Sequence, residues 1–195
     1  TDQDKCRSDF AGSGGDDYLA AARKAGQIVP LIIDMATGSF TAAGQTQTAY
    51  VISVSECNAS HADNFGTKRI AIFSGQQLVA DVDADFMGII VRKTDLDGNG
   101  VDELLMISSD MAQGTITEMA TLASFENGRR RVIHDFSTVV EDSCASEAPG
   151  SESKASVIYA SAFAPGLKPT LTQENYVASC RKPRRWRLLS KGKMQ

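Results

Sequence analysis

Residues 94–106 read Thr-Asp-Leu-Asp-Gly-Asn-Gly-Val-Asp-Glu-Leu-Leu-Met, and this stretch says more about the protein than any other. Oxygen-bearing side chains stand at alternate positions before a bend at Gly100, and a further carboxylate follows three residues later. These side chains are Asp95, Asp97, Asn99 and Glu103. Carboxylate and amide oxygens spaced in this way can converge on one hard cation, and Ca²⁺ matches them best. The stretch therefore predicts a calcium-binding turn followed by an apolar strand.

Two other readings of this stretch are less consistent with its residues. An EF-hand loop needs a bidentate Glu at its twelfth position, which here is Met106, and residues 88–91 favour a strand before the loop. A plain β-turn rich in Asp, Asn and Gly needs no metal. However, four carboxylates within nine residues repel one another unless a cation joins them. Asp102, the fourth, stands at position eight of the loop and is expected to point away from the ion.

A similar turn without the charges precedes this one by 56 residues, since Gly44 aligns with Gly100. The positions of the four oxygen donors are then occupied by Ser39, Thr41, Ala43 and Gln47. Downstream, residues 72–79 resemble residues 124–132, each with a strand, a glycine turn and a return strand. The two copies predict a repeat of 50 to 60 residues, with chance similarity between β-hairpins as the alternative.

The charged loop resembles, residue by residue, the Asp-x-Asp-x-Asp-Gly-x-x-Asp calcium loop of FG-GAP repeats, the integrin-α-like and VCBS-type blades of β-propellers. In that family the side chains at positions one, three, five and nine and the carbonyl at position seven hold the ion. The resemblance therefore implies the ligands Asp95, Asp97, Asn99, the carbonyl of Val101, and Glu103. Asn replaces Asp at position five and Glu replaces Asp at position nine, and both keep an oxygen donor. The resemblance is close over the loop and its following strand, and loose over residues 38–50.

The composition is that of one globular domain, with 195 residues of which 42% are hydrophobic and 23% charged. From residue 28 onward the apolar segments are short and rich in β-branched and aromatic residues, which predicts strands. The segments are 28–33, 48–54, 69–73, 77–82, 88–93, 103–108, 115–125, 131–136, 156–162, 176–180 and 186–189. The expected fold class is therefore mainly β.

The expected architecture is two to three propeller-blade-like antiparallel units after a short N-terminal helix, capped by Asp16 and ended by Gly26. The single domain would comprise a lead-in with the helix (1–27), a degenerate repeat (28–92), the calcium-loop repeat (93–142) and a third β unit with a basic C-terminus (143–195). Three blades do not close a propeller of the usual four to eight. The chain is then an open relative, closed by disulfides or by self-association into a homo-oligomer, or a β-sandwich.

Four cysteines are spread along the chain without a Cys-x-x-Cys pair, and only two histidines accompany them, which favours disulfides over a zinc site. Three pairings are open to them, and we expect Cys6 with Cys57 and Cys144 with Cys180. Buried free thiols in a cytosolic protein are the alternative. Disulfides and a calcium loop together predict a secreted or periplasmic protein. A start at Thr1 is consistent with a removed leader or a trimmed chain, and no apolar run is long enough for a transmembrane segment.

Catalytic motifs are weak, so an enzyme is the less favoured class. His61 beside Asp63 is the one acid/base pair that would suit a hydrolase. Residues 181–195 hold seven basic residues and no acidic one, which suits either a solvated edge strand or contact with an anionic surface. The leading interpretation is a binding module with structural Ca²⁺ and a protein or glycan partner, and no nucleic acid is expected.

Overall fold

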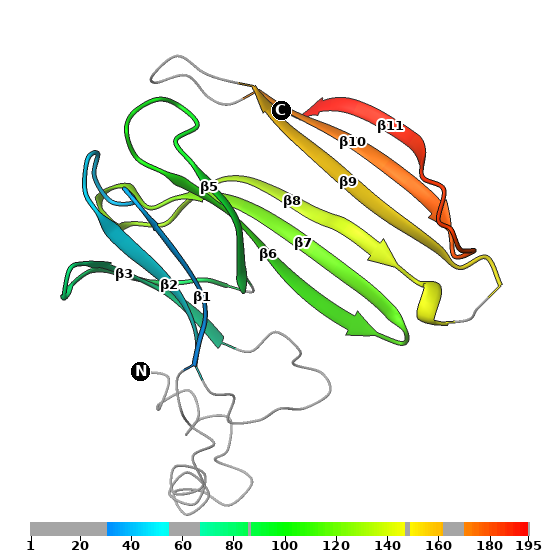
Figure 1. Ribbon diagram of the computed structural model, residues 1–195, viewed down its shortest axis with the longest axis horizontal. Helices are drawn as coiled ribbons and strands as arrows, with labels where there is room; N and C mark the ends of the chain where they lie inside the picture. The colour runs from blue at the N-terminus through cyan, green and yellow to red at the C-terminus, as the bar shows by residue number, and fades with distance from the viewer. Residues whose placement is uncertain (1–30, 55–66, 86, 147–148, 162–169, 195) are drawn as a thin grey trace, which may run out of the picture.

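The computed structural model describes residues 31–54, 67–85, 87–146, 149–161 and 170–194, which form two antiparallel sheets (Figure 1). The first sheet has the strand order β1-β2-β3-β4, and the second has the order β11-β10-β9-β8-β7-β6-β5. The strands of the first sheet are β1 (Leu31–Gly38), β2 (Gln47–Val54), β3 (Thr67–Ser74) and β4 (Gln77–Asp83). Those of the second are β5 (Ile89–Thr94), β6 (Glu103–Ala112), β7 (Thr115–Ser124), β8 (Arg131–Asp142), β9 (Glu152–Ser161), β10 (Thr170–Ser179) and β11 (Arg187–Met194). The expectation of a mainly β fold is confirmed, and the expected N-terminal helix lies outside the described residues.

Alternation of side chains explains why these segments are strands. In β6, Leu104 and Met106 are fully buried on one face, while Leu105 and Ile107 are half-buried on the other. A two-residue turn with left-handed backbone at Gln113 and Gly114 joins β6 to β7, and a two-residue turn with Gly75 at positive φ joins β3 to β4. Local patterns of this kind give each sheet its run of antiparallel neighbours.

A core between the two sheets holds them together. It contains Phe40, Ile70 and Ile72 from the first sheet and its loop, together with Leu104 of β6 and Phe125, the residue after β7, all with no exposed surface. The opposite face of β6 and β7 contributes to a second apolar cluster with residues of β8 and β10. The hairpin that begins at β5 therefore has apolar packing on both faces of its second strand.

Strands β9 to β11 extend the second sheet instead of forming a sheet of their own. The pairing of β8 with β9 is confined to Val140–Asp142 opposite Ser153–Ala155, and beyond it the two strands diverge (Figure 1). The sheets therefore divide the described chain only between β4 and β5. Strands β9 to β11, which belong to the expected third unit, therefore lie in the same sheet as β6 to β8 of the expected calcium-loop unit.

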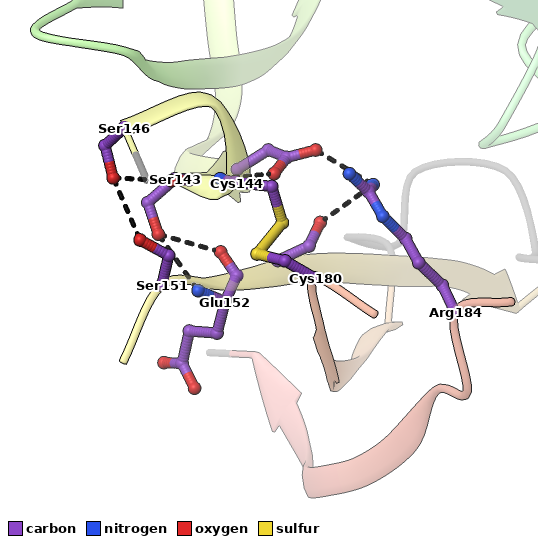
Figure 2. Close-up of a disulfide and its surroundings, with 9 residues drawn as sticks. Ser143, Cys144, Ser146, Ser151, Glu152, Cys180 and Arg184 are labelled. Carbon is purple, nitrogen blue, oxygen red and sulfur yellow. Dashed lines mark hydrogen bonds and ion pairs between the residues drawn. A yellow bond between two sulfur atoms is a disulfide. The ribbon is translucent and has the colours of Figure 1, made fainter. Parts of the chain in front are cut away.

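A disulfide fastens this junction where β8 ends. Cys144 lies in the short 3-10 helix η2 (Cys144–Ser146), and it is bonded to Cys180, the residue after β10 (Figure 2). Arg184 approaches from the other side of the bridge, and its guanidinium lies 2.9 Å from the Asp142 carboxylate. The expected Cys144–Cys180 pair is confirmed, whereas Cys6 and Cys57 lie outside the described residues.

Candidate metal centre

The charged loop connects β5 to β6, and hydrogen bonds from its own backbone shape it. The N–H of Gly100 donates to Asp95 Oδ2 at 2.9 Å, and the N–H of Asn99 donates to Asp97 Oδ1 at 3.1 Å. Gly98 and Gly100 have positive φ angles of 70° and 84°, which glycine adopts at little cost. The loop therefore curls back on itself, with the carboxylates of Asp95 and Asp97 accepting hydrogen bonds from its own backbone.

Three of the predicted ligands meet in this loop. One carboxylate oxygen from each of Asp95, Asp97 and Glu103 lies within 4.8 Å of the others. Asp95 is exposed, Asp97 is half-buried and Glu103 has only 1% of its surface exposed. Burial, above all, raises the pKa of the Glu103 carboxyl, and the charges of Asp97 and Asp95 raise it further, while the hydrogen bond from the Leu96 N–H lowers it. A cation among these oxygens would relieve both the repulsion and the burial of an unpaired charge.

The other two predicted ligands are placed differently. Asn99 Oδ1 accepts a hydrogen bond of 2.7 Å from the Val101 N–H, which occupies one lone pair of that oxygen and leaves the other available. Val101 is buried, with 3% of its surface exposed, and it anchors the end of the loop at the start of β6. The structure therefore groups Asp95, Asp97 and Glu103 directly and keeps Asn99 and Val101 in the same turn.

Asp102 uses its carboxylate to join the two sheets. Its Oδ2 accepts a hydrogen bond of 2.9 Å from the Ser39 N–H and lies 3.5 Å from Lys93 Nζ, while its own N–H donates to the Ser39 carbonyl at 2.6 Å. A Cβ on Gly100 would stand 2.8 Å from the Cβ of Ala43, so these loops approach closely. The two loops that the sequence aligns with each other are in direct contact.

The uncharged loop between β1 and β2 has the same closure as the charged one. Gly38 pairs with Gln47 at its ends, as Thr94 pairs with Glu103, so each loop has eight residues between paired positions. Gly44, at the sixth position, has a φ of 71°, close to that of Gly100. The two hairpins therefore share register, loop length and the bend.

The residue at position nine is buried in both loops, and in each its side chain accepts a hydrogen bond from the backbone N–H of position two. Gln47 Oε1 accepts hydrogen bonds from the N–H groups of Phe40 and Thr41, at 2.8 and 2.9 Å. Glu103 Oε2 accepts a hydrogen bond of 2.8 Å from the N–H of Leu96, the counterpart of Phe40. Sequence alignment places Gln47 under Glu103, but it does not reveal that either side chain holds its own loop closed.

The two loops differ in what joins position nine to position three. In the uncharged loop, Gln47 Nε2 donates a hydrogen bond of 2.6 Å to Thr41 Oγ1. In the charged loop the same positions are Glu103 and Asp97, two carboxylates that have no proton to share when ionised. Where the uncharged loop has the amide N–H of Gln47 as a donor, the charged loop therefore has only carboxylate oxygens.

The remaining predicted residues fall elsewhere. His61 and Asp63 lie outside the described residues, while His134, the second of the two histidines, is in β8 with its ring centroid 4.7 Å from that of Phe136. In the basic C-terminal segment, Lys191 Nζ lies 2.6 Å from Glu174, so this lysine and Arg184 each have an acidic partner within the chain. Among the described residues no helix has the length and apolar character needed to cross a membrane.

Comparison with known proteins yields no match: no family model, no curated protein and no solved structure matches this chain.

Proposed function

We propose that the β5–β6 loop binds Ca²⁺, and that the ion stabilises this hairpin within a secreted or periplasmic binding module built of FG-GAP-like units. The contrast between Gln47 and Glu103 supports this most directly. Both side chains accept a hydrogen bond from the backbone N–H at position two of their loop. Only the loop with Gln47, however, has a hydrogen bond between the side chains at positions nine and three. A cation at the charged loop would replace that bond.

The chemistry of the donors suits a hard ion. The ligands would be the side-chain oxygens of Asp95, Asp97, Asn99 and Glu103 and the carbonyl of Val101. All are oxygens and three are carboxylates, which Ca²⁺ accepts in its flexible shell of six to eight ligands, whereas Mg²⁺ requires a near-ideal octahedron. Because one carboxylate oxygen from each of Asp95, Asp97 and Glu103 already lies within 4.8 Å of the others, the loop needs little rearrangement to bind.

The ion's role would be to stabilise the structure. With Ca²⁺ at about 1 mM and a dissociation constant on the order of 0.1 mM, binding adds roughly 1.4 kcal/mol to the free energy of unfolding. The loop also contacts the first sheet through Asp102 and Gly100. The bound ion would therefore stabilise the contact between the two sheets as well as the hairpin.

The proposed location and partner follow from the disulfide and the loops. A Cys144–Cys180 bridge forms and persists in oxidising compartments, where calcium is also abundant. The partner would be a protein or glycan held by loops at one end of the sheets. Attachment to anionic surfaces through the basic segment is less favoured, since Arg184 and Lys191 are already engaged with Asp142 and Glu174.

Calorimetric titration of the chelator-treated protein with CaCl₂ tests the site. We expect saturable binding near one ion per chain for the wild type, and its loss in Asp95→Ala and Glu103→Gln. Asp102→Asn is the matched control, because it removes a charge from the same loop at a residue that is not a proposed ligand. The Asp102 carboxylate instead accepts a hydrogen bond from the Ser39 N–H. The dissociation constant of this variant is expected to stay within about threefold of the wild type. Absence of binding heat in the wild type, together with an unchanged melting temperature in calcium and in chelator, would refute the proposal.

A further inference from the structure

A cleft opens where β9 and β10 diverge from β8. Its volume is about 530 Å³, within the usual range for small-molecule sites. One wall consists of Leu105, Leu122 and Phe136 from the three strands β6 to β8, and the other consists of Ile158, Ala160 and Leu171 from β9 and β10. Leu122, Phe136 and Leu171 are each 4% exposed and form the inner part of these walls, whereas Ala160 is exposed and lies toward the mouth of the cleft. The interior is thus apolar and open at one side.

The charged groups of the cleft lie on the β5 side. Arg92 lines it, and in the sheet Arg92 pairs with Leu105, so both side chains are on the same face. Arg92 is exposed, and within the described part of the chain no acidic side chain forms an ion pair with it. The cleft therefore combines an apolar interior with one cation whose charge is not used by the fold.

The charged loop forms the rim of the cleft next to Arg92. Asp95 and Leu96 both line the cleft, and Leu96 also packs against the second apolar cluster. The N–H of Leu96 donates to Glu103, so the residue that borders the cleft is held by a proposed calcium ligand. The negative charge of Asp95 repels an anion bound in the cleft, and a cation bound at Asp95 would reduce this repulsion.

We propose that this cleft binds a small amphiphilic carboxylate, with its apolar chain between β6–β8 and β9–β10 and its carboxylate on the Arg92 guanidinium. Arginine presents parallel N–H donors that match a carboxylate in two-point contact. The apolar walls exclude water from the chain and supply affinity by burial. Enhancement of this binding by Ca²⁺ rests on the proposed function, because it requires the ion beside Asp95.

Octanoate is a suitable probe, since it carries this charge and chain and remains soluble with millimolar calcium. Titration into ¹⁵N-labelled protein, followed by amide chemical shifts, should give saturable shifts concentrated in β6, β7 and β9. Octyltrimethylammonium has the same chain with the opposite charge, and it should bind at least tenfold more weakly. Equal affinity for the two amphiphiles would overturn the assignment of Arg92 as the anion receptor.

Arg92→Glu should weaken octanoate binding by about tenfold or more. Arg187→Glu is the matched control, because it reverses an exposed arginine in β11 outside the cleft, and it should change the affinity less than twofold. Ala160→Phe should fill the mouth and abolish binding while the melting temperature stays close to that of the wild type. Unchanged affinity in Arg92→Glu, or octanoate binding that survives in Ala160→Phe, would refute the site.

Calcium distinguishes this inference from the proposed function. We expect octanoate to bind at least threefold more tightly in 1 mM Ca²⁺ than in chelator, and Glu103→Gln to lose this difference. Calcium binding without octanoate binding overturns the cleft assignment and leaves the metal site standing. If calcium does not bind, the proposed function fails, and the comparison of Arg92→Glu with Arg187→Glu in chelator still tests the cleft.

Discussion

The loops at residues 39–46 and 95–102 close hairpins of the same register and length, yet they are stabilised by different means. The first is satisfied by neutral groups, since Gln47 bonds two backbone N–H groups and the Thr41 hydroxyl. The second holds a buried glutamate beside two aspartates. Replacing one amide by one carboxylate at position nine removes the donor that completes the neutral loop. A single turn geometry thus serves as a self-sufficient turn in one hairpin and, as we propose, as a cation site in the other.

The largest expected effect comes from removing the side chain that closes the uncharged loop of residues 39–46. Gln47→Leu leaves the N–H groups of Phe40 and Thr41 without their acceptor, and Gln47 is 3% exposed. We expect a loss of about 3 kcal/mol in the free energy of unfolding, because each unsatisfied buried donor costs roughly 1–3 kcal/mol. Urea denaturation in calcium and in chelator should show the same loss. A loss confined to chelator would indicate that this loop, too, depends on a cation.

The contact between the loops should be next in size. Asp102→Ala removes the acceptor for the Ser39 N–H and the partner of Lys93. The expected cost is about 1.5 kcal/mol, mostly from the part-buried hydrogen bond, since the half-exposed ion pair contributes little. Denaturation curves provide the measurement, and Lys93→Ala is the control that removes the ion pair alone. If both variants lose the same stability, the Ser39 hydrogen bond contributes nothing.

Removal of calcium should affect only the charged loop. The wild type is expected to melt about 3–6 °C lower in chelator than in 1 mM Ca²⁺, which corresponds to roughly 1.4 kcal/mol for a chain of this size. Glu103→Gln copies the residue of the neutral loop and should melt at the same temperature in both buffers. A calcium-dependent shift retained in Glu103→Gln would show that Glu103 is not a ligand. Differential scanning calorimetry measures both proteins.

The smallest expected effect concerns the hydrogen bond between Gln47 and Thr41, which joins the two positions of the uncharged loop that the proposed ion would join in the charged loop. Thr41→Val removes the hydroxyl that accepts from Gln47 Nε2 and keeps the shape of the side chain. We expect a loss of about 1 kcal/mol that does not depend on calcium, as for a typical single hydrogen bond. Asp97→Asn, at the same position of the charged loop, should instead weaken calcium binding. Equal behaviour of the two variants in calcium would remove the distinction between the loops.

Much of the charged loop was predictable because its chemistry is local. Alternating oxygens and glycines with positive φ are features of consecutive residues, and Asp95, Asp97 and Glu103 do come together. Gln47 was aligned correctly with Glu103, but its hydrogen bonds were not foreseen, since an amide at that position has no distinctive sequence signal. The link from Asp102 to Ser39 was missed for a different reason: it spans 63 residues.

By itself, the sequence determined the strands, the two turns of matching length and the cluster of carboxylates, because each depends on side-chain alternation or backbone preference over a few residues. It also favoured the Cys144–Cys180 pair, although three pairings were open. Only the tertiary structure decided that β9–β11 continue the second sheet, that the two loops touch, and that a cleft with Arg92 opens beside the charged loop. Those features depend on which distant strands pair and how far they diverge, and the free energy of such contacts is shared among residues that are not neighbours in the chain.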